Sequence, residues 1–352
     1  MNVLIVGQGY AGSMLAWFLL KNGVDVTVAD RNDLDGSTRV SAGIMLPITG
    51  RRLAKTQNAD KIIPYAKNFY REIESATGVT FFTEKDVLQI FNSISNKNEW
   101  YSRSADHGME NYIGEILSKE KIHTSIINEY GAITLKQSGF VRPALFLDTM
   151  QNFIVGRGKL IQCDFSSESL TLNGSSVSWR NEEYDFVVFC EGHHARTKEL
   201  FEYLPFNPAK GEILDFETHD LPEDYILVNG AYIVPLGNHK FRTGATYEWK
   251  ELDTQPTSEG KNILETNLKS VINCEYSITG HKAGIRPSIK DRRPLLGFHP
   301  LHERIAIFNG LGTKGAMQGP YYANQMAELI VNGKNPDDDV NITRFNSLFP
   351  KQ

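Results

Sequence analysis

Apolar runs and helical patterns alternate at the start of the chain. Residues 2–7 (NVLIVG) form an unbroken apolar run, which is typical of a strand in a parallel sheet that is covered on both faces. Residues 13–23 (SMLAWFLLKNG) predict a buried helix that stops at Gly23, and residues 24–30 (VDVTVAD) predict a second buried strand that ends in a carboxylate. A strand, a glycine turn, a helix and a strand in this order predict a βαβ unit.

The same order of elements returns towards the C-terminus. Residues 184–192 (YDFVVFCEG) predict another buried strand, and residues 305–330 predict a buried strand, a glycine turn and a helix. We place Pro320 in the first turn of that helix, where a missing N–H is tolerated. Further helices are predicted within residues 59–78 and 141–158. The elements together predict an α/β fold that both ends of the chain complete.

A second pattern separates these elements. Residues 81–91 and 210–249 alternate between apolar and polar positions, which predicts antiparallel strands, with LGNH (236–239) as a turn. Residues 37–50 (STRVSAGIMLPITG) predict a loop of small residues whose backbone a large ligand approaches. The polar stretch 93–110 predicts no element.

The two patterns predict two domains. The βαβ pattern assigns residues 1–75, 140–203 and 283–345 to one domain. The antiparallel pattern assigns residues 76–139 and 204–282 to a second domain.

Composition narrows the class of protein. The 352 residues are 41% hydrophobic, which allows a large core, and a net charge of -5 gives no reason to expect nucleic acid or an anionic membrane as a partner. Cys163, Cys190 and Cys274 lie far apart without CxxC spacing, so we predict neither a disulfide framework nor a metal site. We see no leader and no membrane-spanning segment, and therefore expect a cytoplasmic protein.

A glycine motif joins the first strand to the first helix. In Gly7-Gln8-Gly9-Tyr10-Ala11-Gly12 the first glycine permits a tight turn, the second lets the backbone approach a pyrophosphate, and the third allows close helix packing. Asp30 is spaced to accept hydrogen bonds from ribose hydroxyls and to repel a 2′-phosphate, which disfavours NADP. The motif predicts NAD or FAD; a glycine turn without a ligand is the alternative. The second glycine turn, within residues 310–330, would present backbone donors to the far end of a long ligand, which favours FAD.

Further motifs follow in order along nearly the whole chain. They are SAGIML (41–46), YDFVVFCEG (184–192), KGEI (210–213), YIVP (232–235), GAT (244–246), AGIRPSIKDRRPLLG (283–297) and NGLGTKGAM (309–317). Their order resembles that of the glycine oxidase and D-amino-acid oxidase family of FAD-dependent oxidoreductases. The resemblance implies an FAD-binding Rossmann-type, glutathione-reductase-like domain with a second, antiparallel-sheet substrate domain. It also implies oxidation of a CH–NH bond in a small amino acid or amine by hydride transfer to flavin N5.

The glycine motif and the resemblance together assign the cofactor site. Relatives that attach FAD covalently carry a cysteine just before the segment matching RPSIKD, where this chain has Lys282, Ala283 and Gly284, so noncovalent FAD is implied. The residues implied to bind it are Gly7, Gly9, Tyr10, Ala11, Gly12, Asp30, Arg31, Ser41, Ala42, Gly43, Ile44, Met45, Gly192, Gly312, Thr313, Lys314, Gly315 and Ala316.

Four residues are implied to act on the substrate or the flavin. Arg286 matches an arginine that binds the substrate carboxylate through two parallel donors; an ion pair with Asp291 or another acid is the alternative. Tyr232 matches a tyrosine whose hydroxyl reaches the substrate, with a buried structural tyrosine as the alternative. Tyr247 matches a position over the flavin ring. Lys314 matches a cation at the pyrimidine end, with a solvated lysine as the alternative.

His193 and His194 stand where the family often has a tryptophan. A doubled histidine suggests a metal or a proton relay. We expect adjacent side chains to diverge, however, and therefore predict a solvated or phosphate-neighbouring pair.

The expected function is an FAD-dependent amino acid or amine oxidoreductase that uses oxygen or an unknown acceptor. A dehydrogenase with a non-oxygen acceptor and a nucleotide-binding sensor without turnover are alternatives. The turn GLGTKGAM also resembles the FAD domain of bifunctional tRNA-modifying enzymes, which oxidise a carboxymethylaminomethyl group. That activity needs tRNA contact, for which Arg51, Arg52 and KDRRP (290–294) are candidates. An acidic chain without a methyltransferase domain makes it the second choice.

Overall fold

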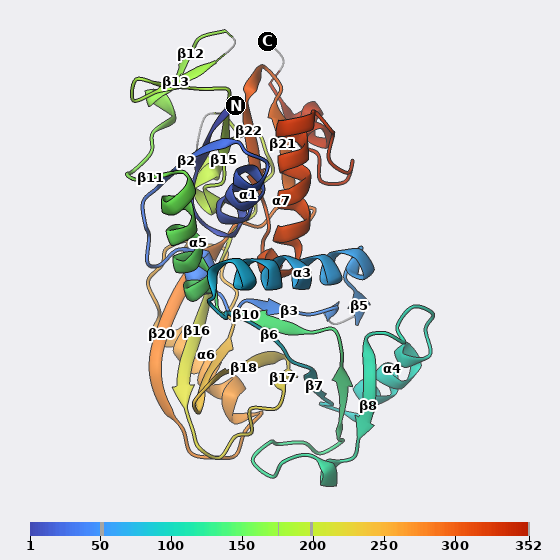
Figure 1. Cartoon of the computed structure of the whole chain (residues 1–352). Coiled ribbons are helices and arrows are strands. Elements are labelled where there is room, and N and C mark those ends of the chain that lie inside the picture. Colours follow the sequence, from blue (N-terminus) through green and yellow to red (C-terminus); the bar gives the residue numbers. More distant parts are fainter. Residues whose placement is uncertain (50–52, 175, 198–199, 351–352) are drawn as a thin grey trace.

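The computed structural model describes residues 1–49, 53–174, 176–197 and 200–350 (Figure 1). Two large sheets lie at opposite ends of the molecule, and helix α3 (Ala59–Thr77) lies across the region between them. The mixed α/β architecture predicted from the sequence is confirmed.

The first large sheet has six strands in the order β11–β2–β1–β15–β22–β21. The first five are parallel and β21 pairs antiparallel with β22, so strands from both ends of the chain lie side by side. The bounds are β1 (Asn2–Val6), β2 (Asp25–Asp30), β11 (Lys159–Gln162), β15 (Phe186–Phe189), β21 (Leu295–His299) and β22 (His302–Asn309).

Helices cover this sheet. Helix α1 is buried from Tyr10 to Leu19 because it packs against α5 and α7, which explains why its sequence is apolar on every side. Besides α3, the helices found anywhere in the described part of the chain are α1 (Tyr10–Lys21), α2 (Ser37–Val40), α4 (Ile94–Ser104), α5 (Pro143–Arg157), α6 (Ser258–Lys269) and α7 (Gly315–Asn332), with short 3₁₀ turns η1 (Lys119–Lys121), η2 (Ser167–Ser169), η3 (Gly192–Thr197) and η4 (Ile342–Leu348).

The second large sheet has eight strands in the order β20–β16–β19–β18–β17–β7–β9–β8. Adjacent strands of this sheet are antiparallel, except that β7 pairs parallel with β17. This parallel pairing joins the two predicted antiparallel regions into one sheet. The strands are β7 (Val87–Ile90), β8 (Ile113–Leu117), β9 (Ala132–Leu135), β16 (Ala209–Glu217), β17 (Ile226–Asn229), β18 (Ala231–Gly237), β19 (Lys240–Gly244) and β20 (Ser277–Arg286).

Three small sheets complete the fold of the residues that the structure describes. They comprise β3 (Ile44–Met45) with β10 (Gly139–Val141) and β6 (Phe82–Glu84), β12 (Thr171–Leu172) with β13 (Val177–Trp179) and β14 (Glu182–Tyr184), and β4 (Ile48–Thr49) with β5 (Ala54–Lys55). The predicted division into two domains stays a proposal. One of its boundaries, between residues 282 and 283, falls within the single strand β20.

Several local predictions can be compared with the elements. The turn predicted at residues 236–239 is present after β18, and the structure shows it to be a two-residue hairpin loop with positive φ at Asn238 and His239. The predicted loop 37–50 contains α2, β3 and β4 within its described part. The stretch 93–110 contains α4, which the sequence pattern missed because only Trp100 of this helix is buried. The N-cap Ser93, which accepts from the Asn96 N–H at 3.0 Å, was the available signal.

The predicted place of Pro320 was wrong. Helix α7 begins at Gly315, so Pro320 is its sixth residue and lies in the second turn. Proline has no N–H, and the Ala316 carbonyl therefore lacks its helical partner. The hydroxyl of Tyr70 on α3 donates to that carbonyl at 2.5 Å instead. The carbonyl that the proline leaves free thus allows a hydrogen bond between α3 and α7 inside the core.

We expect Tyr70→Phe to lower the free energy of unfolding by about 1–3 kcal/mol, since it leaves the buried Ala316 carbonyl unsatisfied. Urea denaturation measures this change. Tyr101→Phe is the control, because Tyr101 is exposed, and a change within about 0.5 kcal/mol is expected. Equal stabilities of the two variants would contradict the assignment.

Candidate active site

A cavity of about 610 Å³ connects the two large sheets. Val6 and Ala29 line it at the carboxyl ends of β1 and β2, and Gly211 and Tyr232 line it on β16 and β18. Ligands of open parallel sheets bind at the carboxyl ends of the strands. The cavity therefore begins where the glycine motif predicts a nucleotide.

The glycine turn forms one end of the cavity. Gly7 has a φ of 101°, and a Cβ at this position would lie 2.6 Å from the Cys190 carbonyl oxygen. Gly9 lines the cavity as the N-cap of α1. Gly12 does not line it; a Cβ there would lie 1.8 Å from the Gly7 carbonyl oxygen, so Gly12 allows close packing of helix on strand. Because α1 has neither a side-chain cap nor an acid in its first turn, its N-terminus favours an anion.

Asp30 lines the cavity beside this turn. Its two carboxylate oxygens accept the backbone N–H groups of Gln8 and Asn32, each at 2.6 Å. A carboxylate oxygen accepts two hydrogen bonds. The fixed carboxylate can therefore also accept hydrogen bonds from hydroxyl groups of a ligand.

The doubled histidine lies at the same end of the cavity. The rings of His193 and His194 lie with centroids 3.9 Å apart, so the expectation that these side chains diverge was wrong. His194 hydrogen-bonds Arg31, whose guanidinium also lies 3.6 Å from Asp33. Burial, and then His194, lowers the pKa of His193 to about 4, so His193 is neutral near pH 7. Within the described ranges no three His, Cys, Asp or Glu residues are grouped to hold a metal ion.

Residues 41–44 line the middle of the cavity. Met45 does not, because its side chain is fully buried in the core. The Arg242 guanidinium donates to both carboxylate oxygens of Asp215 (2.7 and 2.9 Å) and to the Ser41 carbonyl oxygen (2.8 Å). This ion pair on the eight-stranded sheet thereby fixes the loop.

The second glycine turn lines the cavity through residues 312–313 and 315–316. Helix α7 has neither a side-chain cap nor an acid in its first turn, so its N-terminus also favours an anion. Lys314 departs from the prediction, because it does not line the cavity and its ammonium donates to Thr56 Oγ1 at 3.1 Å. Burial, with a smaller contribution from Arg292, lowers the pKa of Lys314.

Arg286 lies at the other end of the cavity. Its Nη1 and Nη2 donate to the carbonyl oxygens of Lys210 (3.2 Å) and Thr246 (3.1 Å). The guanidinium carbon lies 4.3 Å from the centroid of the Tyr247 ring. The hydrogen bonds to the two carbonyl oxygens and the stacking on the Tyr247 ring orient the guanidinium but do not neutralise its charge.

The alternative for Arg286, an ion pair with Asp291, was wrong. Asp291 pairs with Arg344 at 2.9 Å, and Arg286 forms no salt bridge with any described acid. A Cβ on Gly211 would lie 2.0 Å from Arg286 Nη2. Glycine at this position therefore lets the guanidinium lie against the strand.

Two tyrosines accompany Arg286. Burial raises the pKa of Tyr232 to about 12, although Arg286 opposes the shift, so the Tyr232 hydroxyl keeps its proton. Tyr232 lines the cavity, so its hydroxyl is placed to contact a ligand there. Tyr247 is 55% exposed at the cavity and its ring stacks on Trp249.

The cavity also contains residues that the sequence analysis did not select. Gly211 and Asn309 lie in the quoted motifs KGEI and NGLGTKGAM, which were the available signals. Asn309 donates to the Gly192 carbonyl at 2.9 Å and links the end of β22 to η3. Thr38 accepts the Tyr10 N–H at 3.2 Å from the loop of small residues.

Comparison with known proteins decides the family. A family model described as DAO, FAD dependent oxidoreductase, matches residues 2–329. The chain belongs to the DAO family. It is accordingly an FAD-dependent oxidoreductase, and the predicted resemblance is confirmed.

Relatives of this DAO-family chain include a protein that it matches over nearly its whole length and a longer bifunctional protein. Glycine oxidase from Bacillus subtilis is 24% identical, over 94% of this chain and 93% of that protein. The tRNA 5-methylaminomethyl-2-thiouridine biosynthesis bifunctional protein MnmC from Saccharophagus degradans is 23% identical over 91% of this chain, which spans only 48% of that protein. The crystal structure of iminodiacetate oxidase from Chelativorans sp. has a TM-score of 0.81 and 20% identity, covering 97% of this chain and 98% of the other. The MnmC match fits the tRNA alternative without contradicting the main interpretation.

The cavity of this DAO-family enzyme suits FAD. It offers two uncapped helix N-termini, a carboxylate held by backbone donors, and a volume within the usual range for ligand sites, about 300–1,000 Å³. Of the candidate tRNA contacts, Arg51 and Arg52 lie outside the described residues, and Arg293 lies 3.8 Å from Asp339. Across the described ranges, no helix has the length and hydrophobicity of a membrane span.

Proposed function

We propose that this enzyme oxidises the CH–NH bond of a small amino acid, or of an amine that carries a carboxylate. The observation that supports this most is Arg286, an oriented guanidinium that pairs with no acid among the described residues and lies in the same cavity as the glycine turn. A guanidinium presents two parallel donors at the spacing of carboxylate oxygens. Bound FAD supplies the acceptor for the hydride that leaves the substrate carbon.

Groups along the cavity would hold the cofactor. The α1 N-terminus at Gly7 and Gly9 would bind the pyrophosphate, and Asp30 the ribose. Residues 41–44 and the α7 N-terminus would hold the flavin. Lys314 and Met45 are left out of this set, since neither lines the cavity.

The substrate end would act by binding and orientation. Arg286 would bind the carboxylate, and the protonated Tyr232 hydroxyl would donate a further hydrogen bond to it. Tyr247 would hold the guanidinium plane by stacking. Fixing the carboxylate fixes the adjacent carbon, whose C–H bond must face the acceptor.

We further propose that FAD is bound noncovalently, in a cytoplasmic protein. Positions 282–284, where covalent relatives carry cysteine, are Lys282, Ala283 and Gly284. Cys163 and Cys190 line the cavity at the Asp30 end instead. After acid precipitation the yellow colour should stay in the supernatant; colour in the pellet would contradict this binding mode.

We expect Arg242→Met to weaken FAD binding about tenfold, because the Ser41 carbonyl loses a charged donor and Asp215 loses its partner. Fluorescence titration of the apoprotein with FAD measures the dissociation constant. Lys240→Met is the matched control, since Lys240 lies on the same strand and pairs with Glu217 at the surface. Equal constants for both variants would show that the ion pair does not hold the loop.

A substrate panel tests the proposed function. Glycine, N-methylglycine, iminodiacetate and L-proline are compared with the amide of each acid, in air with peroxide detection and with an artificial acceptor. We expect turnover of at least one acid and weak turnover of its amide. Peroxide release would identify an oxidase, and turnover with the artificial acceptor alone would identify a dehydrogenase. Equal turnover of acids and amides would contradict carboxylate recognition.

A further inference from the structure

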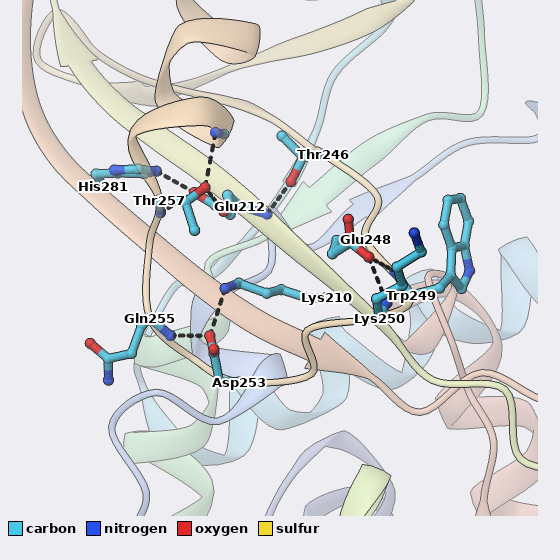
Figure 2. A network of polar contacts seen from close by, with 11 residues as sticks. Lys210, Glu212, Thr246, Glu248, Trp249, Lys250, Asp253, Gln255, Thr257 and His281 are labelled. Carbon is cyan, nitrogen blue, oxygen red and sulfur yellow. Dashed lines mark hydrogen bonds and ion pairs between the residues drawn. The ribbon is translucent and has the colours of Figure 1, made fainter.

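Two charged residues of β16 lie behind the substrate end of the cavity. Lys210 and Glu212 are only 2% and 4% exposed, and neither lines the cavity. Side chains alternate along a strand, so these two lie on the face opposite Gly211, which faces the cavity beneath Arg286. Figure 2 shows both side chains extending to the segment that carries Asp253, Gln255 and Thr257.

Their polar contacts fix that segment. Lys210 Nζ donates to Asp253 Oδ1 at 2.6 Å. The Glu212 carboxylate accepts the Thr257 N–H at 3.0 Å and the Thr257 hydroxyl at 2.8 Å, and lies 2.7 Å from His281 Nε2. Every carboxylate oxygen of Glu212 thus has a partner, and its side chain is held in one orientation (Figure 2).

The backbone groups of Lys210 and Glu212 connect this network to Arg286. The Glu212 N–H donates to Thr246 Oγ1 at 2.9 Å, and the Thr246 carbonyl accepts from Arg286 Nη2 at 3.1 Å. The Lys210 carbonyl accepts from Arg286 Nη1 at 3.2 Å. Both carbonyls that orient the guanidinium therefore belong to residues that the network holds from behind.

Stability alone does not require such a network. Burying charged side chains costs desolvation free energy, and apolar residues of similar size often serve equally well. Buried polar groups do fix one arrangement, because alternatives leave them unpaired. The polar character of the network therefore favours a role in fixing the positions of the groups that it contacts.

We propose that Glu212 is a positioning residue for Arg286. By holding residues 246–257 against β16, it fixes the carbonyl oxygens that set the direction of the guanidinium towards a substrate carboxylate. This inference rests on the proposed function, in which Arg286 binds that carboxylate.

Glu212→Gln tests the proposal, because the amide nitrogen cannot accept from Thr257. Glycolate, a carboxylate without an amine, is the probe, and calorimetry with the FAD-loaded protein measures its dissociation constant. We expect the constant to rise about fivefold, the effect of one lost hydrogen bond, while FAD content stays unchanged. Glu217→Gln is the control, since Glu217 lies on the same strand and pairs with Lys240 at 3.5 Å near the surface.

A double-mutant cycle separates positioning from general damage. In an Arg286→Met background, Glu212→Gln should no longer weaken glycolate binding. An equal rise in both backgrounds, or no rise in the native background, would overturn the positioning role. If Arg286→Met alone leaves glycolate binding unchanged, both this inference and the proposed carboxylate site fail. Should Glu212→Gln not fold, Thr257→Val removes one of the same bonds, and the same coupling with Arg286 is expected.

Discussion

Arg286→Met should raise KM for the best acid of the panel about tenfold to a hundredfold. The variant loses both donors to the carboxylate. A net loss of about 1.5–3 kcal/mol, the usual contribution of a hydrogen bond to a charged group, corresponds to a rise of this size. The FAD content should be unchanged, because the glycine turn and Asp30 lie at the other end of the cavity. Steady-state kinetics on acid and amide pairs measures the effect, and the amides should be nearly insensitive.

Arg293→Met is the matched control for this variant. Arg293 lies in the same quoted motif but outside the cavity, 3.8 Å from Asp339. Its KM should match the native value. If Arg286→Met also kept the native preference for acids, another group would have to bind the carboxylate.

Gly7→Ala should yield protein without bound FAD. A side chain at a φ of 101° is strained, and the added Cβ would lie 2.6 Å from the Cys190 carbonyl oxygen. Strain of this kind costs about 1–3 kcal/mol, and relieving the contact requires the turn to move from the end of β15. The N–H groups proposed for the pyrophosphate move with it. Absorbance of the purified protein and a titration of apoprotein with FAD measure the loss.

Gly156→Ala controls for the added methyl group. Gly156 lies inside α5, and a Cβ there meets no other atom within 4 Å. Alanine should stabilise the helix by about 0.5–1 kcal/mol and leave FAD binding intact. Native FAD affinity in Gly7→Ala would show that the turn does not bind the cofactor.

Local signals made the nucleotide end predictable. The glycine turn and Asp30 lie within 30 residues, and their spacing reflects the geometry of one βαβ unit. Arg286 was predicted through a motif of the family, and the structure adds that no acid in the described part of the chain pairs with it.

Side-chain direction was not predictable from the same signals. Lys314 follows a glycine in a matched turn, yet its ammonium binds Thr56, which comes from a distant segment. Met45 ends a cavity loop but packs into the core. The ring contact between His193 and His194 depends on burial that no local pattern encodes.

Polar contacts between residues far apart in the sequence could not be predicted for a related reason. Arg242 and Ser41 are 201 residues apart, and Lys210 and Asp253 are 43 apart. No periodicity connects such pairs, because they meet only after the eight-stranded sheet has formed. The parallel pairing of β7 with β17, which joins two sequence regions into that sheet, escaped prediction in the same way.

The central claim is that one cavity holds FAD at the glycine turn and a substrate carboxylate at Arg286. Anaerobic mixing of the yellow protein with the panel acids, followed by absorbance, tests it most directly. The account predicts that at least one acid bleaches the visible flavin band, that its amide does so far more weakly, and that Arg286→Met abolishes the difference. A protein that carries no flavin, or whose flavin no panel acid reduces, would contradict it.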